Sequence, residues 1–325
     1  MTSTDSTESA GQRRRGRRTG CYVFLIALGV LLAGVLVLAG VAYWQNQRQE
    51  PEVRTVLPRM SERSQSPPED GPEPAHPAEI RRGRLEVDLS VAQLIVVPGQ
   101  AGEPMRLDAE YDPHFYELVQ TGGETLGGTS EETSGEPWSY HVHFAPTGSS
   151  VMALLRVKLG AQPPTVRLTL PRDVSVSLVG EVHSSFAALE LGGLRVETID
   201  LEVSGGAVAV SFLTPLQEPM DDLSMVGDKG SVKVVGLGNA SPRTAFFLQH
   251  LGELDLDLRG AWVRDAEIDA RAYIAGGTVW LPRNVEIEGL DGRRSGLAPV
   301  TGDEIPRPRL RVTPTEYGGR LVFID

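Results

Sequence analysis

Between His183 and Pro282 one short sequence phrase is repeated five times: Ser185-Phe-Ala-Ala-Leu-Glu-Leu191, Gly206-Ala-Val-Ala-Val-Ser-Phe212, Gly230-Ser-Val-Lys-Val-Val235, Gly252-Glu-Leu-Asp-Leu-Asp-Leu258 and Gly277-Thr-Val-Trp-Leu281. A small residue opens each version, and successive openings lie 21, 24, 22 and 25 residues apart. A period in the twenties with one alternating strand per repeat is typical of stacked β architectures. The repeat therefore predicts an all-β fold of the solenoid type.

The repeat that starts at Gly252 predicts which side chains face the core and which face water. Its three leucines alternate with Asp255 and Asp257. Because neighbouring side chains of a strand point to opposite faces, the leucines are expected in a narrow core and the carboxylates in water. Glycine tolerates positive φ, so the opening glycines are expected to be structural corners. These corner glycines are Gly206, Gly230, Gly252 and Gly277.

Composition excludes some functions. The chain has 325 residues, a formal charge of −12 and 6% aromatic residues. Residues 81–325 carry 22 basic against 34 acidic side chains, so bulk charge does not favour nucleic acid as a partner. Cys21 is the only cysteine, and no disulfide can form within one chain.

An uncharged segment, 21–44, is long enough to cross a bilayer, because 24 helical residues extend about 36 Å. Five arginines precede it within residues 13–18. The positive-inside rule then places a basic tail, 1–20, in the cytoplasm and the rest of the chain outside. A cleaved signal peptide is the alternative, although the segment is long for one.

Seven prolines among polar residues predict a disordered linker at 45–80, followed by one folded domain at 81–325. Gly83-Arg-Leu-Glu-Val-Asp-Leu89 resembles the phrase at Gly252 and predicts the same kind of coil. Alternation predicts further strands at 94–97, 105–111, 138–144, 153–159, 165–170, 310–312 and 321–324. Loops are expected at 121–136 and 289–305.

Several glycine phrases carry a resemblance: Leu191-Gly-Gly-Leu194, Ser204-Gly-Gly-Ala207, Gly236-Leu-Gly-Asn-Ala240, Gly252 to Gly260, and Ala275-Gly-Gly-Thr-Val-Trp-Leu-Pro282. Together they resemble bacterial toast-rack domains, related to the C-terminal domains of LiaF-like envelope-stress proteins and to putative adhesins of the β-helix type. The resemblance implies a single-stranded right-handed β-helix, in a family with no established enzymatic activity. LiaF-like proteins carry a bundle of membrane helices, whereas this chain has one candidate, so control of a sensor kinase is not carried over.

Candidate contacts come from polar and aromatic residues. His141 and His143 share one face of a predicted strand and could reach one metal ion, but two ligands do not make a site, and nothing in the sequence brings His114 near them. No metal is therefore expected. The pair Asp255 and Asp257 could serve a sugar-cleaving β-helix, although solvated carboxylates are the simpler interpretation.

Trp262 follows the Gly260 corner and is the tryptophan most expected to present a stacking surface. Ser184 and Ser185 beside His183 could suggest a nucleophile. Adjacent strand residues face opposite ways, however, and no Gly-x-Ser-x-Gly elbow is present. We expect neither a catalytic residue nor a cofactor.

The sequence thus predicts a non-enzymatic, single-pass protein of the bacterial inner membrane with an extracytoplasmic β-solenoid that acts as an interaction, scaffolding or envelope-stress module. The expected partner is an envelope protein or polysaccharide. Two alternatives stay open. One is a carbohydrate-binding or carbohydrate-active β-helix, and the other is a structural protein that self-assembles through its end coils.

Overall fold

The structure is a computed structural model that describes residues 52–56, 81–122, 138–290 and 307–325. The chain divides into two compact units. One of them comprises Pro51–Leu154 with Gln162–Asp325 and holds all the described strands. The predicted basic tail and membrane helix, 1–44, lie outside the described residues. No helix in the described ranges combines the length and apolar character needed to cross a bilayer.

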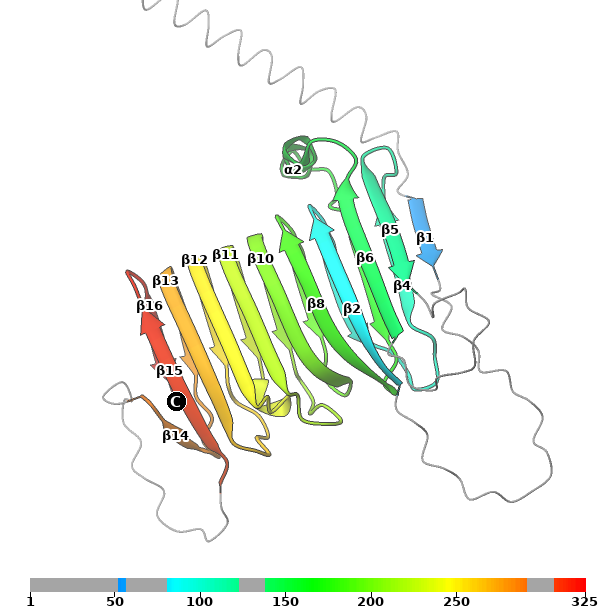
Figure 1. Ribbon diagram of the computed structural model, residues 1–325. Helices are drawn as coiled ribbons and strands as arrows, with labels where there is room; N and C mark the ends of the chain where they lie inside the picture. Colours follow the sequence, from blue (N-terminus) through cyan, green and yellow to red (C-terminus); the bar gives the residue numbers. More distant parts are fainter. Residues whose placement is uncertain (1–51, 57–80, 123–137, 291–306) are drawn as a thin grey trace, which may run out of the picture. The chain divides into compact units, whose positions relative to one another are not determined.

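The strand-bearing unit is one sheet of 16 described strands that bends back on itself (Figure 1). Most of its strand pairs run parallel. We call the part that contains β2 the first layer. It consists, in order, of β5 (Tyr116–Gly122), β6 (Trp138–Pro146), β2 (Arg81–Ser90), β8 (Val174–His183), the amino-terminal parts of β10 (Arg195–Ser211), β11 (Asp222–Val235), β12 (Thr244–Asp257) and β13 (Ala266–Trp280), then β15 (Arg309–Glu316) and β14 (Glu286–Glu288).

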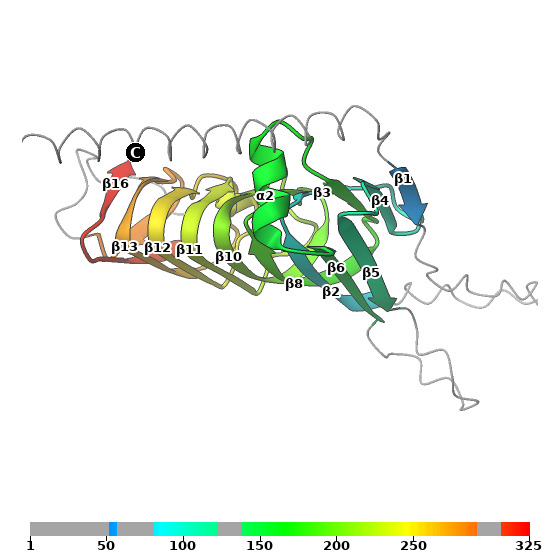
Figure 2. The same cartoon turned by 90° about the horizontal axis from the view of Figure 1, so that it is seen from above.

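The second layer contains the carboxyl-terminal parts of the same four long strands. Its order is β1 (Glu52–Val56), β4 (Arg106–Tyr111), β7 (Thr165–Leu170), β3 (Gln93–Pro98), β9 (Phe186–Glu190), the later parts of β10 to β13, and β16 (Arg320–Ile324). Seen from above, β10 to β13 each curve from one layer into the other (Figure 2). The all-β prediction is confirmed, because the chain forms one large and mainly parallel sheet.

The pairing register shows a repeat. Thr198 pairs with Asp222, Asp222 with Thr244, and Thr244 with Glu267. These steps of 24, 22 and 23 residues come close to the spacings of the repeated phrase. Each step brings equivalent side chains to the same height in neighbouring strands, so apolar residues stack on apolar residues.

The core lies where the alternate side chains of each strand are buried. On β12, Ala245, Phe247, Leu254 and Leu256 are at most 2% exposed, and the polar Gln249 is buried on the same face. Turns that follow the long strands add Phe212, Met220 and Leu237, the last from the short 3₁₀ helix η1 (Leu237–Asn239). The core is narrow and aliphatic, as the low aromatic content predicts.

Three of the four predicted corner glycines form a row where the long strands bend between layers. Gly206 pairs with Gly230, and Gly230 pairs with Gly252. Gly277 does not continue this row, because Ala275 occupies the position opposite Gly252. Gly277 has a different reason to be glycine: a Cβ there would lie 1.8 Å from the carbonyl oxygen of Leu254.

Two predicted segments differ in the structure. The strand expected at 153–159 is wrong, because Ser150–Lys158 forms the helix α2. Its Ala, Leu, Met, Arg and Lys residues are strong helix formers, and their propensity outweighs the short alternation seen in the sequence. The linker expected at 45–80 contains one strand, β1, which pairs antiparallel with β4. The rest of that linker lies outside the described residues.

Candidate functional site

The acid pair of β12 does not lie free in water. Asp255 accepts a hydrogen bond from the backbone N–H of Thr278 on β13 at 3.0 Å. Asp257 is 9% exposed and binds Arg259 through two side-chain hydrogen bonds of 2.7 and 2.8 Å, which raises the pKa of Arg259. The prediction of two solvated carboxylates is therefore wrong for Asp257, because a turn residue covers and pairs it.

Trp262 is also not a surface contact. It is 6% exposed, and its indole N–H donates to the carbonyl oxygen of Leu258 at 2.7 Å. The indole nitrogen lies close to Gly238, where a Cβ would be 2.7 Å away. The large ring packs into the core next to the turn that follows β12. Burial of its apolar surface stabilises the folded chain. The prediction that Trp262 presents a stacking surface is therefore wrong.

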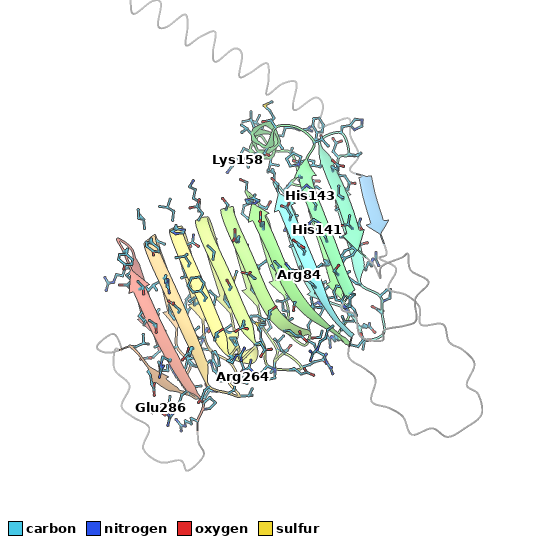
Figure 3. All side chains as sticks on the ribbon, in the orientation of Figure 1. Arg84, His141, His143, Lys158, Arg264 and Glu286 are labelled. Atoms are coloured by element: carbon cyan, nitrogen blue, oxygen red, sulfur yellow. The ribbon has the colours of Figure 1, made fainter. Side chains whose placement is uncertain are left out.

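His141 and His143 follow one another along β6 on one face, and both are half-buried (Figure 3). Their ring centroids lie 6.4 Å apart, and each makes a different contact. Nδ1 of His141 is 3.5 Å from the hydroxyl of Thr121, whereas Nδ1 of His143 is 2.7 Å from Oδ2 of Asp88. His114 does not join them, because it pairs with Asp112 at 3.1 Å.

Asp88 is central because β2 lies between β6 and β8. It is opposite His143 on one side and opposite Glu181 on the other. Two residues further along the same face of β8, Nε2 of His183 is 3.0 Å from Oε2 of Glu181. Ligand atoms of Asp88, Glu181 and His183 lie within 4.8 Å of one another. We call Asp88, His143, Glu181 and His183 the histidine–carboxylate cluster.

Sequence reasoning named His143 as a possible ligand and His183 only beside the two serines, and it missed the cluster that they form with Asp88 and Glu181. The period-two pattern of each strand does place Asp88, Glu181 and His183 on outward faces. What the sequence lacks is the order of the strands, because Asp88 and Glu181 lie in different parts of the chain. The alternation could have nominated each residue, but only the pairing of β2 with β6 and β8 brings them together.

The opposite face of β6 is buried in the core. Tyr140, Val142 and Phe144 of β6 are at most 5% exposed, and the Tyr140 hydroxyl donates to Oε1 of Gln120 on β5. Burial raises the pKa of Tyr140 to about 12. The cluster therefore rests on packed strands that fix the backbone positions of its side chains.

The second layer has a shallow apolar groove of about 270 Å³ on its outer face. Phe186 of β9, 61% exposed, forms one side of the groove. Small side chains on β9 itself and on the strands beside it leave the space next to Phe186, namely Ala188, Ala207, Ala209 and Ser231. Gln93 and Lys233 also line it. We call this the Phe186 groove.

The serines beside His183 have structural roles. Ser185 is fully buried, its hydroxyl donates to the carbonyl oxygen of His183 at 2.8 Å, and it accepts a hydrogen bond from the N–H of Ala92 at 3.0 Å. Ser184 occupies the bend with a φ of 49°. The two loops expected at 121–136 and 289–305 fall largely at 123–137 and 291–306, outside the described residues.

Comparison with known proteins gives a sparse result. No protein-family model matches the chain, and no curated protein matches it significantly. A crystal structure described as a putative cell adhesion protein from Clostridium sporogenes is similar over 84% of this chain and 99% of its own, with 8% sequence identity and a TM-score of 0.36.

Proposed function

We propose that this chain is a non-enzymatic interaction module of the bacterial envelope. In this proposal the sheet is a single-stranded right-handed β-helix of the toast-rack type, which follows one membrane helix at 21–44 and a proline-rich linker. The domain lies outside the inner membrane, and the N-terminus lies in the cytoplasm. The partner is an envelope protein that binds the outer face of the second layer.

The observation that carries this proposal is the Phe186 groove. Phe186 is 61% exposed and lies beside several alanines. A partner that covers this surface would remove a large apolar area from water, which favours binding. Neighbouring strands hold the groove in place, since Phe186 pairs with Ala207 and Ala188 pairs with Ala209. A rigid apolar surface of this kind suits a protein side chain.

A polysaccharide fits the groove less well. Sugar hydroxyls that leave water need hydrogen-bonding partners, and in the groove these come only from Gln93, Ser231 and Lys233 among its lining residues. The features that suggested a carbohydrate also have other roles: Trp262 is buried, and Asp257 pairs with Arg259. These contacts favour the protein partner over the carbohydrate-active alternative.

Site-specific photocrosslinking in cells tests the proposal. A photoreactive amino acid at Ala188 or Ala209 is expected to trap the same envelope protein, because the two residues are neighbours in the groove. Ala101 is an exposed alanine in a turn and gives the matched control position. Phe186→Ser is expected to abolish both crosslinks without loss of folding. Equal capture from all three positions, or capture from none, would contradict a specific protein partner.

A further inference from the structure

We propose that the histidine–carboxylate cluster is a zinc site. It would bind Zn²⁺ through Asp88, Glu181 and His183, with His143 either as the fourth ligand or as the group that orients Asp88. This inference is independent of the Phe186 groove, which lies in the other layer.

The geometry of the cluster needs little rearrangement to hold an ion. Zinc binds imidazole nitrogen and carboxylate oxygen at about 2.0–2.2 Å, so tetrahedral ligand atoms lie roughly 3.3–3.5 Å apart. The ligand atoms of Asp88, Glu181 and His183 are already within 4.8 Å of one another. Small side-chain rotations would bring them to the bonding distance, because all three project from the same face of adjacent strands.

The donor set also suits zinc. Two carboxylates and two neutral imidazoles would balance the charge of one divalent ion, and mixed nitrogen and oxygen ligands favour zinc over calcium or magnesium, which prefer oxygen alone. The 2.7 Å contact between His143 and Asp88 has the form of a carboxylate–histidine pair that orients a metal ligand.

The surroundings add negative charge next to the cluster, although Arg84 also lies on this face of β2, two residues before Glu86. Glu202 of β10 pairs in register with Glu181, and Glu86 precedes Asp88 by two residues on the same face of β2. Within the described ranges neither Glu86 nor Glu202 forms an ion pair, in contrast to Asp257 and Asp269, which bind arginines. A divalent cation would relieve the repulsion that these carboxylates exert on one another.

Zinc binding to the full-length chain, purified in mild detergent after chelator treatment, tests the site. Competition with a chromogenic zinc indicator is expected to give one Zn²⁺ per chain. The double variant Asp88→Asn with His183→Gln should lower the affinity at least 100-fold, and His143→Gln should lower it roughly 10- to 100-fold. Zinc at 100 times its Kd should raise the Tm by about 5 °C or more.

The pair of His114 and Asp112 provides the matched control, because it has the same chemistry and a 3.1 Å contact but no further ligand nearby in the described structure. His114→Gln should leave zinc affinity within about twofold of the wild-type value. X-ray absorption at the zinc edge reports ligands independently of the variants and should show imidazole nitrogen. Absence of binding, equal loss in His114→Gln, an oxygen-only spectrum, or preference for calcium would each overturn the proposal.

Discussion

Gly230 and Gly252 have two separate reasons to be glycine. Both have positive φ, 112° and 117°, where a side chain is strained. Each also lies against the strand below it: a Cβ on Gly252 would be 1.8 Å from the carbonyl oxygen of Gly230, and one on Gly230 would be 1.7 Å from that of Gly206. The bend between the layers thus requires backbones to approach without side chains between them.

Gly252→Ala is expected to destabilise the fold by about 3 kcal/mol or more, because backbone strain and a backbone clash add together. Gly102→Ala separates the two causes. Gly102 has a φ of 80°, but a Cβ there meets nothing within 4 Å, so the expected cost is only about 1–2 kcal/mol. Urea unfolding of both variants measures the difference. Equal destabilisation would show that close approach of the strands contributes nothing.

Tyr140 makes stability sensitive to alkaline pH. Its pKa is raised to about 12 in the folded chain by burial, whereas an unfolded tyrosine ionises near pH 10. Its contribution to stability is therefore complete below pH 10 and is lost as the pH rises towards 12, because the unfolded chain ionises first.

Tyr140→Phe should therefore lose less stability than the wild type between pH 9 and pH 11.5, as measured by urea unfolding at each pH. Tyr317→Phe is the control, because Tyr317 is 60% exposed. An unchanged pH dependence in Tyr140→Phe would exclude the buried hydroxyl as its source.

One repeat of the sheet should be dispensable for folding. β11 and β12 pair with a constant offset of 22 residues, so deletion of 222–243 would place β12 where β11 lies, beside β10. Buried positions would still meet buried positions across the new pair. The shortened chain is expected to fold with a smaller denaturant m-value, because less surface is buried.

Deletion of 222–244 is the control for this experiment. One extra residue shifts the register by one and turns the apolar face of β12 towards water, so this variant should fail to fold cooperatively. Circular dichroism and urea unfolding compare the two deletions. If both behave alike, the register of the repeat does not determine the fold.

At the scale of the whole molecule, β16 is the last strand of the second layer among the described residues. Its outward residues Val322 and Ile324 are 45% and 42% exposed. Apolar strands at the end of a stack are available for pairing with another copy, which is the third function that the sequence left open.

Self-assembly predicts association that rises with concentration in sedimentation velocity. Val322→Lys should reduce it, because lysine on an edge strand opposes pairing. Val263→Lys, at a valine that is 65% exposed in a turn, should not. A chain that stays monomeric at high concentration, or one whose association survives Val322→Lys, would exclude assembly through β16.

The second layer was largely predictable, and the first only in part: the strands β2, β6 and β15 were expected, whereas β5, β8 and β14 were not. The phrases opened by Gly206, Gly230 and Gly252 alternate cleanly, so their strands were expected. The earlier parts of the same strands were missed because half-buried apolar residues such as Phe246 and Leu248 also point outward and blur the alternation. The phrase at Gly83 correctly predicted a strand, β2, but this strand lies in the first layer, and its glycine makes room for the ring of Trp138.

The sequence by itself determined the repeat, the all-β class and the face of each well-patterned strand, because strand alternation and glycine conformation are local properties of the chain. Only the tertiary structure decided which strands are neighbours, because pairing joins segments far apart in the sequence. It placed Asp88 between His143 and Glu181, and it buried Trp262 and Asp257. The corner glycines stay architectural residues, and the groups available for binding are those that strand order brings together.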